Sequence, residues 1–265
     1  HFMFSLESLN QAQREAAEKI YGPLLLLAGA GSGKTRTITY RIANLIKNHN
    51  IPPQRILGVT FTNKAAKEMK MRTNQLIGRK EIKGINLCTF HSLGLRILKK
   101  EMQHLGRPTN FSIYDQSDAL SIIRESLKNF KQDKKSFDLK VILSKISWLK
   151  NKCLGPSDYA NSEYFDPYSP YDMATHYCYE QYQERLLFFN AIDFDDILYL
   201  TNKIFKENPE VARKYSEQFM FIMVDEYQDT NSLQLDIILH LTSTHQNLCV
   251  VGDDDQAIYS FRGAE

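Results

Sequence analysis

The sequence predicts an α/β fold in which a parallel sheet covered by helices carries an inserted all-helical subdomain. Two observations favour this fold class. Five short apolar runs are bounded by turn or polar residues, which is typical of strands buried on both faces. Helical patterns follow the first three runs, and such alternation of strand and helix indicates a doubly wound domain. The expected strands are residues 24–28, 56–60, 85–89, 219–224 and 248–252.

The helices between these strands are predicted from the spacing of apolar residues. After the first strand, apolar residues recur at i, i+4, i+7 and i+8, so that they share one helix face. Similar registers follow the second and third strands. The residues that define the three helices are Ile38, Ile42, Leu45 and Ile46, then Ala65, Met69 and Arg72, and finally Leu93, Ile97 and Leu98.

The middle of the chain shows no strand-like run. Amphipathic stripes from Leu120 to Phe130 and from Leu139 to Leu149 predict helices, and a helical pattern resumes at Tyr177 after a Pro-rich loop. We therefore expect residues 108–190 to form the helical insertion, while residues 1–107 and 191–265 fold together.

Charge is distributed unevenly along the 265 residues. The formal net charge is +2, but residues 1–110 hold 18 basic and 6 acidic side chains, a net charge of +12. Residues 111–265 hold 15 basic and 25 acidic side chains, a net charge of −10. The asymmetry fits a polyanionic partner for the first part of the chain. Charges that decorate solvated helix faces would produce it too, and from charge alone that reading is favoured.

Composition excludes several classes of protein. With 43% hydrophobic and 24% charged residues, the chain is well away from disorder. No apolar run approaches the ~18–20 residues of a membrane helix, and the layout of a signal peptide is absent. The four cysteines form no Cys-x-x-Cys pair, so neither a zinc site nor a disulfide framework is indicated. We expect a cytoplasmic protein.

The strongest local signal is the run AGAGSGKT, which follows the first expected strand and opens a helix. Glycines let main-chain N–H groups converge on phosphate oxygens, and a helix N-terminus favours their negative charge. In such a P-loop Lys34 reaches the β- and γ-phosphates and the Thr35 hydroxyl binds Mg²⁺. The alternative is a glycine-rich turn without a ligand, and the usual first glycine is Ala28 here. The expected phosphate-binding residues are Ala28, Gly29, Ala30, Gly31, Ser32, Gly33, Lys34 and Thr35.

A P-loop needs a carboxylate at the end of another strand. Asp225 ends the fourth expected strand and suits a Mg²⁺ contact, while Glu226 suits positioning or deprotonating the attacking water. Taken alone, two adjacent acids are equally typical of a solvated turn. Together with the P-loop they predict Mg²⁺-dependent hydrolysis of a nucleoside triphosphate.

Further blocks lie in order along the chain. They are LNxxQR from Leu9, AGAGSGKT from Ala28, TFTNKAA from Thr60, TFHS from Thr89, DFDD from Asp193, VDEYQDTN from Val224 and VGDDDQAIYSFRGA from Val251. This ordered set resembles the UvrD/Rep/PcrA group of superfamily 1 DNA helicases. The resemblance spans Leu9 to Ala264 and is far more specific than any single block.

The resemblance implies a RecA-like P-loop NTPase domain, built here by residues 1–107 and 191–265. It implies ATP-driven 3′→5′ movement on single-stranded DNA and at single-strand/duplex junctions. Gln13 matches the residue that reads the adenine edge, Arg36 one that packs near the adenine, and Gln256 one that senses the γ-phosphate. Family members continue through a second RecA-like domain that supplies arginine fingers. We therefore expect a fragment that lacks this partner domain, binds nucleotide weakly and hydrolyses it negligibly.

Binding of single-stranded DNA needs aromatic faces for the bases and cations or donors for the phosphates. Phe61 looks like a stacking residue, and Tyr259, Phe261 and Arg262 form a second aromatic and basic cluster; the family usually has Trp at the position of Phe261. Core packing is the alternative for each aromatic taken singly, and for Phe194 it is equally favoured. Donors to phosphate are expected from Thr60, Asn63, Thr89 and His91.

Three questions stay open from the sequence. Residues 128–152 hold eight basic and two acidic side chains, and they either contact duplex DNA or form a solvated lysine face. A different P-loop enzyme, such as a nucleotide kinase, is a second function class, against which the GDDDQ and TFTN blocks argue. A third function class is a non-catalytic nucleic-acid-binding module. The intact Lys34, Asp225 and Glu226 argue against it.

Overall fold

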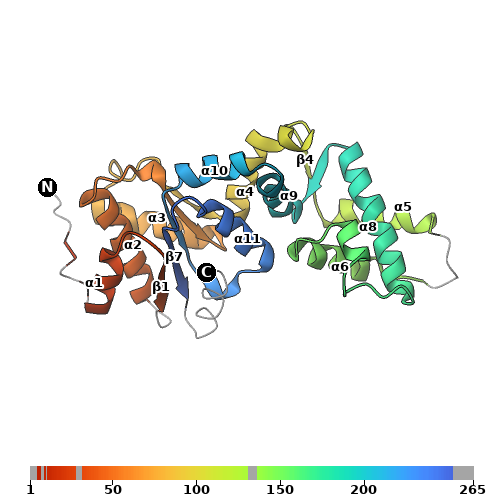
Figure 1. The fold of residues 1–265 in the computed structure, drawn as a ribbon, viewed down its shortest axis with the longest axis horizontal. Helices are drawn as coiled ribbons and strands as arrows, with labels where there is room; N and C mark the ends of the chain where they lie inside the picture. The colour runs from red at the N-terminus through yellow and green to blue at the C-terminus, as the bar shows by residue number, and fades with distance from the viewer. Residues whose placement is uncertain (1–4, 7–8, 10, 28–31, 131–135, 253–265) are drawn as a thin grey trace. The chain divides into compact units, whose positions relative to one another are not determined.

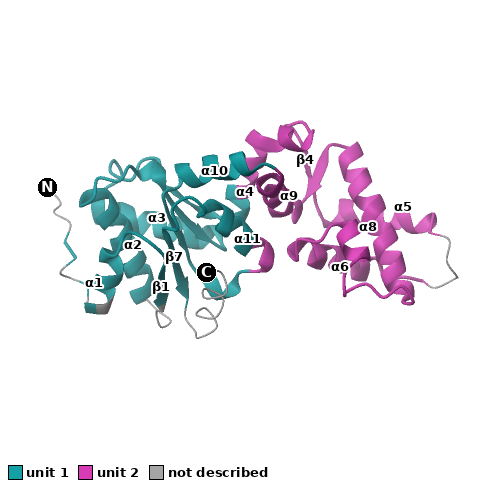
Figure 2. Cartoon of the chain, in the orientation of Figure 1, with its two compact units in different colours: residues 1–93, 208–230, 235–265 teal, residues 94–207, 231–234 magenta. Residues whose placement is uncertain are grey.

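The computed structural model describes residues 5, 6, 9, 11–27, 32–130 and 136–252 (Figure 1). The chain divides into two compact units, shown separately in Figure 2: unit 1 is residues 1–93, 208–230 and 235–265, and unit 2 is residues 94–207 and 231–234. The strands are β1 (Leu24–Leu27), β2 (Ile56–Thr60), β3 (Asn86–Thr89), β4 (Ser112–Tyr114), β5 (Ala191–Asp193), β6 (Phe221–Val224) and β7 (Leu248–Gly252). The α-helices are α1 (Gln11–Glu18), α2 (Ser32–Lys47), α3 (Asn63–Ile77), α4 (Phe90–Glu101), α5 (Gln116–Lys128), α6 (Leu139–Asn151), α7 (Pro156–Ala160), α8 (Pro170–Phe188), α9 (Asp196–Glu207), α10 (Pro209–Gln218) and α11 (Ser232–Leu241).

Unit 1 is built on a five-stranded sheet in the order β1-β7-β6-β2-β3, and every pairing in it is parallel. The prediction of a mixed α/β fold with a parallel sheet is confirmed. Each of the five predicted apolar runs contains one of these strands. Because the strands are parallel, the segments that follow β1, β6, β2 and β3 leave the sheet at one common edge, which we call the carboxyl edge.

Helices cover the sheet because its strands are apolar on both faces. Ile42 of α2 and Met69 of α3 belong to one buried cluster with Met223 of β6. The neighbouring strand residues Ile222 and Val224 are also buried, at 1% and 0% exposure. Since successive side chains of a strand point to opposite faces, the second face is covered as well. Figure 1 shows α10 and α11 on that side.

Unit 2 has a core of its own. Helices α5, α6 and α8 contribute Ile123, Ile146 and Tyr179 to a second buried cluster. The helix α5 begins at a reciprocal capping box, in which Asp115 accepts from the N–H of Asp118 at 2.8 Å and Asp118 accepts from the N–H of Asp115 at 3.1 Å. The amphipathic stripes predicted for this region therefore correspond to packed helices.

An all-helical insertion is not confirmed. Within residues 108–190 the segment Ser112–Tyr114 forms β4, which pairs in parallel with β5 (Ala191–Asp193). Both strands are only three residues long, and β4 is largely exposed, so the sequence has no apolar run there that would predict a strand. The compact units divide the chain at residues 93/94 and 207/208, whereas our predicted limits of the insertion are 108 and 190. Those limits as boundaries of independent folding remain a prediction.

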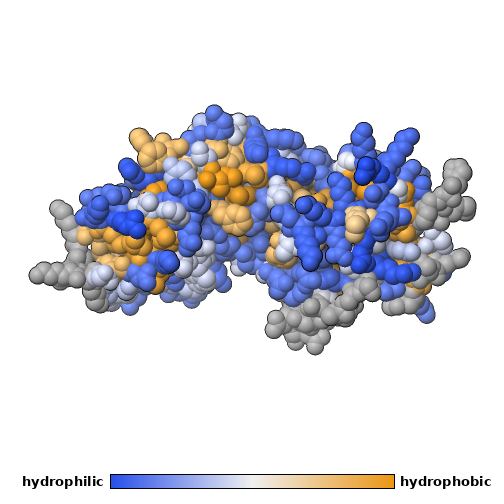
Figure 3. All heavy atoms as spheres, turned by 180° about the vertical axis from the view of Figure 1, so that it is seen from behind, coloured by the Kyte–Doolittle hydropathy of each residue, from blue (hydrophilic) through white to orange (hydrophobic). Residues whose placement is uncertain are grey.

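None of the helices in the described part of the chain is both long enough and apolar enough to cross a membrane. The face drawn in Figure 3 is mainly hydrophilic, with hydrophobic residues exposed in separate places.

Candidate functional site

The acids predicted for the nucleotide site follow β6 at the carboxyl edge. The N–H of Asp225 donates to the carbonyl of Val59 at 3.0 Å, which extends the main-chain pairing of β6 with β2 by one residue. Asp225 is therefore held by the sheet itself, and its position does not depend on a flexible loop.

Lys34, in the first turn of α2, meets both acids. Its Nζ lies 3.0 Å from Oδ1 of Asp225 and also contacts Oε1 of Glu226. Burial lowers the pKa of Lys34, but the hydrogen bonds to Glu226 and Asp225 outweigh burial and leave the pKa raised. The structure thus brings together three of the four residues predicted to be catalytic.

The two acids respond differently to this lysine. Burial raises the pKa of Asp225, and the contact with Lys34 does not fully offset that effect. At Glu226 burial also raises the pKa, but the hydrogen bond from Lys34 outweighs it, so the pKa is lowered. Glu226 is the more exposed of the two, with a side-chain exposure of 37% against 13% for Asp225. A carboxylate that is open to solvent and ionised suits a group that acts on water.

Glu226 adopts an unusual backbone conformation. Its φ of 54° and ψ of 44° lie in the left-handed region, which residues other than glycine seldom occupy. Its N–H donates to Oδ1 of Asp225 at 2.8 Å, and Nε2 of Gln228 donates to its Oε2 at 2.6 Å. Gln228 is not among the predicted site residues, although it lies in the VDEYQDTN block. This side chain and Lys34 fix the two carboxylate oxygens of Glu226 from different sides.

Gln13, predicted to read the adenine, lies beside the start of α2. A Cβ atom built on Gly33 would lie 3.2 Å from Nε2 of Gln13, so a side chain at position 33 would press on this amide. Because Gly33 has no side chain, α1 and α2 can approach each other closely at this point. Arg36, the other predicted adenine contact, has its guanidinium 5.2 Å from the ring centre of Tyr40.

Two buried side chains of α2 hold the end of the segment that carries Gln13. Arg41 is 1% exposed and donates to the carbonyls of Lys19 and Ile20. Asn44 donates from Nδ2 to the carbonyl of Ala17 at 3.2 Å. Sequence reasoning missed both residues, because they lie between the apolar positions that define the helix pattern. They fix α1 against α2 and so set the place of Gln13.

The TFTN and TFHS blocks lie side by side in unit 1. The parallel register of β2 and β3 pairs Thr60 with Thr89. The next residues, Phe61 and Phe90, have ring centres 5.4 Å apart with a tilt of 51°. The two blocks therefore form one surface at the carboxyl edge, next to the acids that follow β6 in the neighbouring strand position.

The predicted phosphate donors differ in accessibility. Thr60 is 1% exposed, and its hydroxyl donates to the carbonyl of Thr62 at 3.1 Å. The hydroxyl of Thr89 caps α4 by accepting from the N–H of Ser92 at 3.1 Å. By contrast Asn63 is exposed at the start of α3, and His91 and Phe61 are half-buried. The threonines shape this surface through local hydrogen bonds, whereas Phe61 and Asn63 present groups to solvent.

Several predicted site residues are outside the described residues. They are Ala28, Gly29, Ala30, Gly31, Gln256, Tyr259, Phe261 and Arg262.

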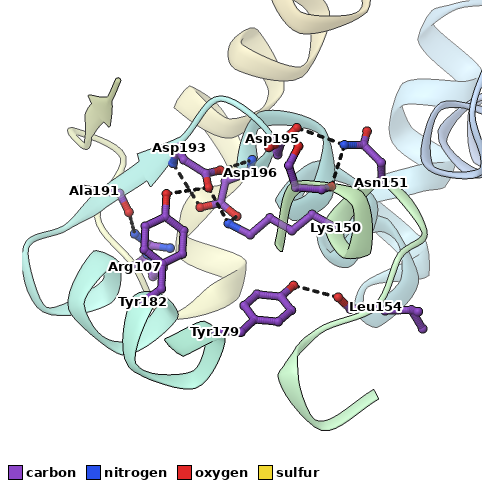
Figure 4. A network of polar contacts seen from close by, with 11 residues as sticks. Arg107, Lys150, Asn151, Leu154, Tyr179, Tyr182, Ala191, Asp193, Asp195 and Asp196 are labelled. Carbon is purple, nitrogen blue, oxygen red and sulfur yellow. Dashed lines mark hydrogen bonds and ion pairs between the residues drawn. The ribbon is translucent and has the colours of Figure 1, made fainter. Parts of the chain in front are cut away.

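The DFDD block in unit 2 inverts the usual distribution of apolar and charged side chains. Phe194 is 60% exposed, so it does not pack in the core. Asp193 and Asp196 are buried with Lys150, which is 0% exposed and lies 2.7 Å and 2.9 Å from their carboxylates (Figure 4). The hydroxyl of Tyr182 donates to Asp193 at 2.8 Å. Because it is buried, Lys150 can neither contact duplex DNA nor lie on a solvated lysine face, the two roles considered for residues 128–152.

Burial and charge act on these two carboxylates in opposite directions. Burial raises the pKa of Asp196 to about 6. Burial also acts to raise the pKa of Asp193, but Lys150 outweighs it and the pKa is lowered. The two residues also cap α9 reciprocally, since the N–H of Asp196 donates to Asp193 at 2.7 Å and the N–H of Asp193 donates to Asp196 at 3.2 Å.

The donor set at the carboxyl edge fits a magnesium–nucleotide complex. Mg²⁺ prefers oxygen ligands and takes most of them from phosphates and water, with one or two from the protein. Asp225 offers a carboxylate there, and Thr35 a hydroxyl in the first turn of α2. Among the described residues no group of three or more His, Cys, Asp or Glu side chains is arranged to hold a metal alone. Thr35 and Asp225 would hold the ion only together with phosphate oxygens.

The chain is similar to known DNA helicases. The chain is 45% identical over 260 residues to the ATP-dependent DNA helicase PcrA of Bacillus subtilis, an alignment that covers 98% of this chain and 34% of that protein. It is 44% identical to PcrA of Staphylococcus aureus, with 98% and 35% coverage, and 44% identical to a probable DNA helicase II homologue of Rickettsia felis, with 98% and 39% coverage. The chain spans about a third of the length of these relatives. The sequence model of the UvrD/REP helicase N-terminal domain matches residues 9–265, and the chain therefore belongs to that family.

Proposed function

We propose that the chain is the ATP- and single-stranded-DNA-binding part of an ATP-dependent, 3′→5′ DNA helicase. One observation carries the proposal: Lys34, Asp225 and Glu226 lie at the same sheet edge as the paired TFTN and TFHS blocks. The relatives named as ATP-dependent DNA helicases support it. The direction of movement comes from the family resemblance, and a cytoplasmic location follows from the proposed substrate.

The ion pairs of Lys34 suggest how the site changes when nucleotide arrives. The phosphates compete with Asp225 and Glu226 for the ammonium group, so Lys34 exchanges carboxylate oxygens for phosphate oxygens. Asp225 and Thr35 would then be the residues that hold Mg²⁺, which would supply neutralisation of phosphate charge. Glu226 loses the contact that lowers its pKa, so it becomes a stronger base for the attacking water.

The sheet offers a short route from this site to the proposed DNA surface. Asp225 is bonded through its N–H to Val59, and Thr60 and Phe61 follow directly in the chain. A shift of the main chain at Asp225 would therefore move Val59, and Phe61, the proposed stacking residue, lies only two residues further along the chain. With Phe194 exposed, unit 2 presents a second aromatic face of the kind that bases stack on.

We further propose that the 265 residues alone bind nucleotide weakly and hydrolyse it negligibly. The resemblance assigns the transition-state arginines to a second RecA-like domain, and such arginines contribute ~10³–10⁵ in rate in comparable phosphoryl transfers. Rapid DNA-stimulated ATP hydrolysis by the 265-residue chain would contradict this part of the proposal.

The test is ATP hydrolysis by the full-length protein with and without single-stranded DNA. We expect DNA to stimulate hydrolysis, Lys34→Ala to abolish it, and Glu226→Gln to block hydrolysis while nucleotide still binds. Activity that persists in Lys34→Ala would show that the P-loop assignment is wrong. The products separate the alternatives, because a nucleotide kinase forms a phosphorylated acceptor and a helicase motor releases ADP and inorganic phosphate.

A further inference from the structure

Unit 1 has a basic groove that the proposed ATP and DNA sites do not use. It has a volume of about 920 Å³ and lies between α3 and the turn formed by residues 79–84. Its cationic lining side chains are all exposed, and no acidic side chain lines it. The lining residues are Lys67, Lys70, Met71, Asn74, Arg79, Lys80, Ile82, Lys83 and Gly84. We call this feature the α3 groove.

The cations of the α3 groove are not neutralised by the protein. The two nearest acids in sequence are already paired, Glu68 with Arg72 at 3.0 Å and Glu81 with Lys47 at 3.7 Å. Within residues 32–130 and 136–252, none of the five lysines and arginines of the groove forms an ion pair. Five like charges around one hollow repel each other, so a polyanion that enters the groove relieves this repulsion.

The turn that forms one wall is built into the fold. Gly78 ends α3 with a φ of +98°, and Gly84 has a φ of +90°, values that residues with a side chain rarely adopt. Between them Ile82 is 3% exposed and anchors the turn in the core of unit 1. The wall is therefore held in place before any ligand binds, which reduces the entropy lost on binding.

One face of α3 leads from the proposed DNA surface to the groove. Lys64, Lys67, Met71 and Asn74 are spaced i, i+3, i+7 and i+10, so they share one face of α3. That face spans about 15 Å along the helix axis, starting three residues after Phe61. A strand stacked on Phe61 would find lysines along α3 as it leaves the carboxyl edge.

The lining favours a nucleic-acid backbone over an acidic polypeptide. Met71, at 52% exposure, is the exposed apolar side chain of the lining, since Ile82 is buried. The remaining apolar surface consists of the aliphatic stems of lysine and arginine, whose charged ends stay in water. An amphipathic acidic segment needs several apolar side chains to pack against, and the groove exposes one, whereas phosphates need only the charges.

We propose that the α3 groove is a second binding site for single-stranded nucleic acid, which holds the sugar–phosphate backbone beyond the nucleotides bound at Phe61. The inference rests on the proposed function, because the strand reaches the groove from the Phe61 surface.

The experiment compares short and long oligothymidylates, of about 4 and about 16 nucleotides. Binding to the 265-residue chain is measured by fluorescence anisotropy across a salt series. The groove variant combines Lys67→Gln, Lys70→Gln, Lys80→Gln and Lys83→Gln. A matched control removes the same number of exposed lysines elsewhere, through Lys99→Gln, Lys100→Gln, Lys203→Gln and Lys206→Gln. Equal thermal midpoints of the variants establish that both are folded.

We expect the groove variant to bind the long oligonucleotide at least about tenfold more weakly at ~0.1 M salt, with a salt slope smaller by about 0.7 for each lost phosphate contact. Affinity for the short oligonucleotide should stay unchanged, and the control variant should bind both lengths as wild type does. An unchanged affinity for the long oligonucleotide, or an equal loss in groove and control variants, would overturn the proposal. The proposal would also be overturned if polyglutamate bound through these lysines and the oligonucleotide did not.

Phe61→Ala separates the two proposals. If it weakens binding of both lengths while the groove variant changes nothing, the groove proposal alone fails. If Phe61→Ala leaves both affinities unchanged, the proposed DNA surface itself is wrong.

Discussion

Replacing Lys150 with methionine tests the buried charge network of unit 2 (Figure 4). Methionine approximates the length of the lysine stem but carries no charge, so both carboxylates lose their cation at once. Removing one partner of a buried ion pair costs about 3–5 kcal/mol, because the remaining charge stays buried. Asp193 keeps the hydroxyl of Tyr182 and both acids keep their capping bonds, so we expect a loss of about 3–4 kcal/mol at pH 7.

The cost should depend on pH in a defined direction. Without Lys150 the pKa of Asp193, which the lysine holds below the value of about 3.9 in the unfolded chain, rises above that value because burial is no longer opposed. The pKa of Asp196, already raised to about 6, rises further. An acid whose folded-state pKa is raised destabilises the protein progressively as the pH increases from the unfolded to the folded value. The difference in stability between wild type and Lys150→Met should therefore be largest near pH 7 and shrink towards pH 5.

Urea denaturation at both pH values measures this difference. The chain has one tryptophan, Trp148, two residues before Lys150 on the same helix, so its emission reports on unit 2. The control combines Lys150→Met with Asp193→Asn and Asp196→Asn. No buried carboxylate then remains without a cation, so this variant should regain most of the lost stability. A loss below about 1 kcal/mol in the single variant, or a loss independent of pH, would refute the reasoning.

Three further predictions concern single positions. Arg41→Met leaves the carbonyl groups at the end of α1 without their donor, so the free energy of unfolding should fall by about 1–3 kcal/mol. Because Gln13 is then displaced, the variant should also show a smaller preference for ATP over GTP in binding assays. Gly58→Ala places a Cβ atom 2.6 Å from Cδ2 of Leu87, so a loss of about 1–3 kcal/mol is expected from chemical denaturation. Asp196→Asn removes a carboxyl with a pKa of about 6, whose ionisation destabilises the folded chain as the pH rises from about 4 to 6. The thermal midpoint of the variant should therefore rise relative to that of wild type across this interval. A difference in midpoint that does not change with pH would contradict the raised pKa of Asp196.

The strands of unit 1 could be predicted because they are buried on both faces. Runs such as Phe221–Val224 are apolar at every position, which is typical of a short strand with helices on both sides. The pair β4 and β5 could not be predicted in this way. Its strands are short, β4 is exposed, and Ser112 and Ala191 are far apart in the chain, so only the folded structure brings them together.

The candidate site follows the same division. The P-loop and the acids after β6 could be recognised because spacing within one segment defines them. The surroundings of the DFDD block could not, since hydropathy places Phe194 inside and Lys150 outside, and the structure has the reverse. Burial of Lys150 depends on two carboxylates from another part of the chain, and no local pattern encodes a partner at that distance. The same holds for Arg41, whose acceptors are main-chain carbonyls that any sequence provides.

The register that pairs Thr60 with Thr89 has a consequence for how this surface tolerates change. Main-chain hydrogen bonds align the two blocks, so the side chains that follow them can vary without disturbing the alignment. An aromatic residue of another size can replace the half-buried Phe61, because this ring does not set the register. A deletion of one residue within either strand is different, since it turns every following side chain to the opposite face. Substitutions should therefore tune this surface gradually, whereas insertions and deletions in β2 or β3 should abolish it in one step.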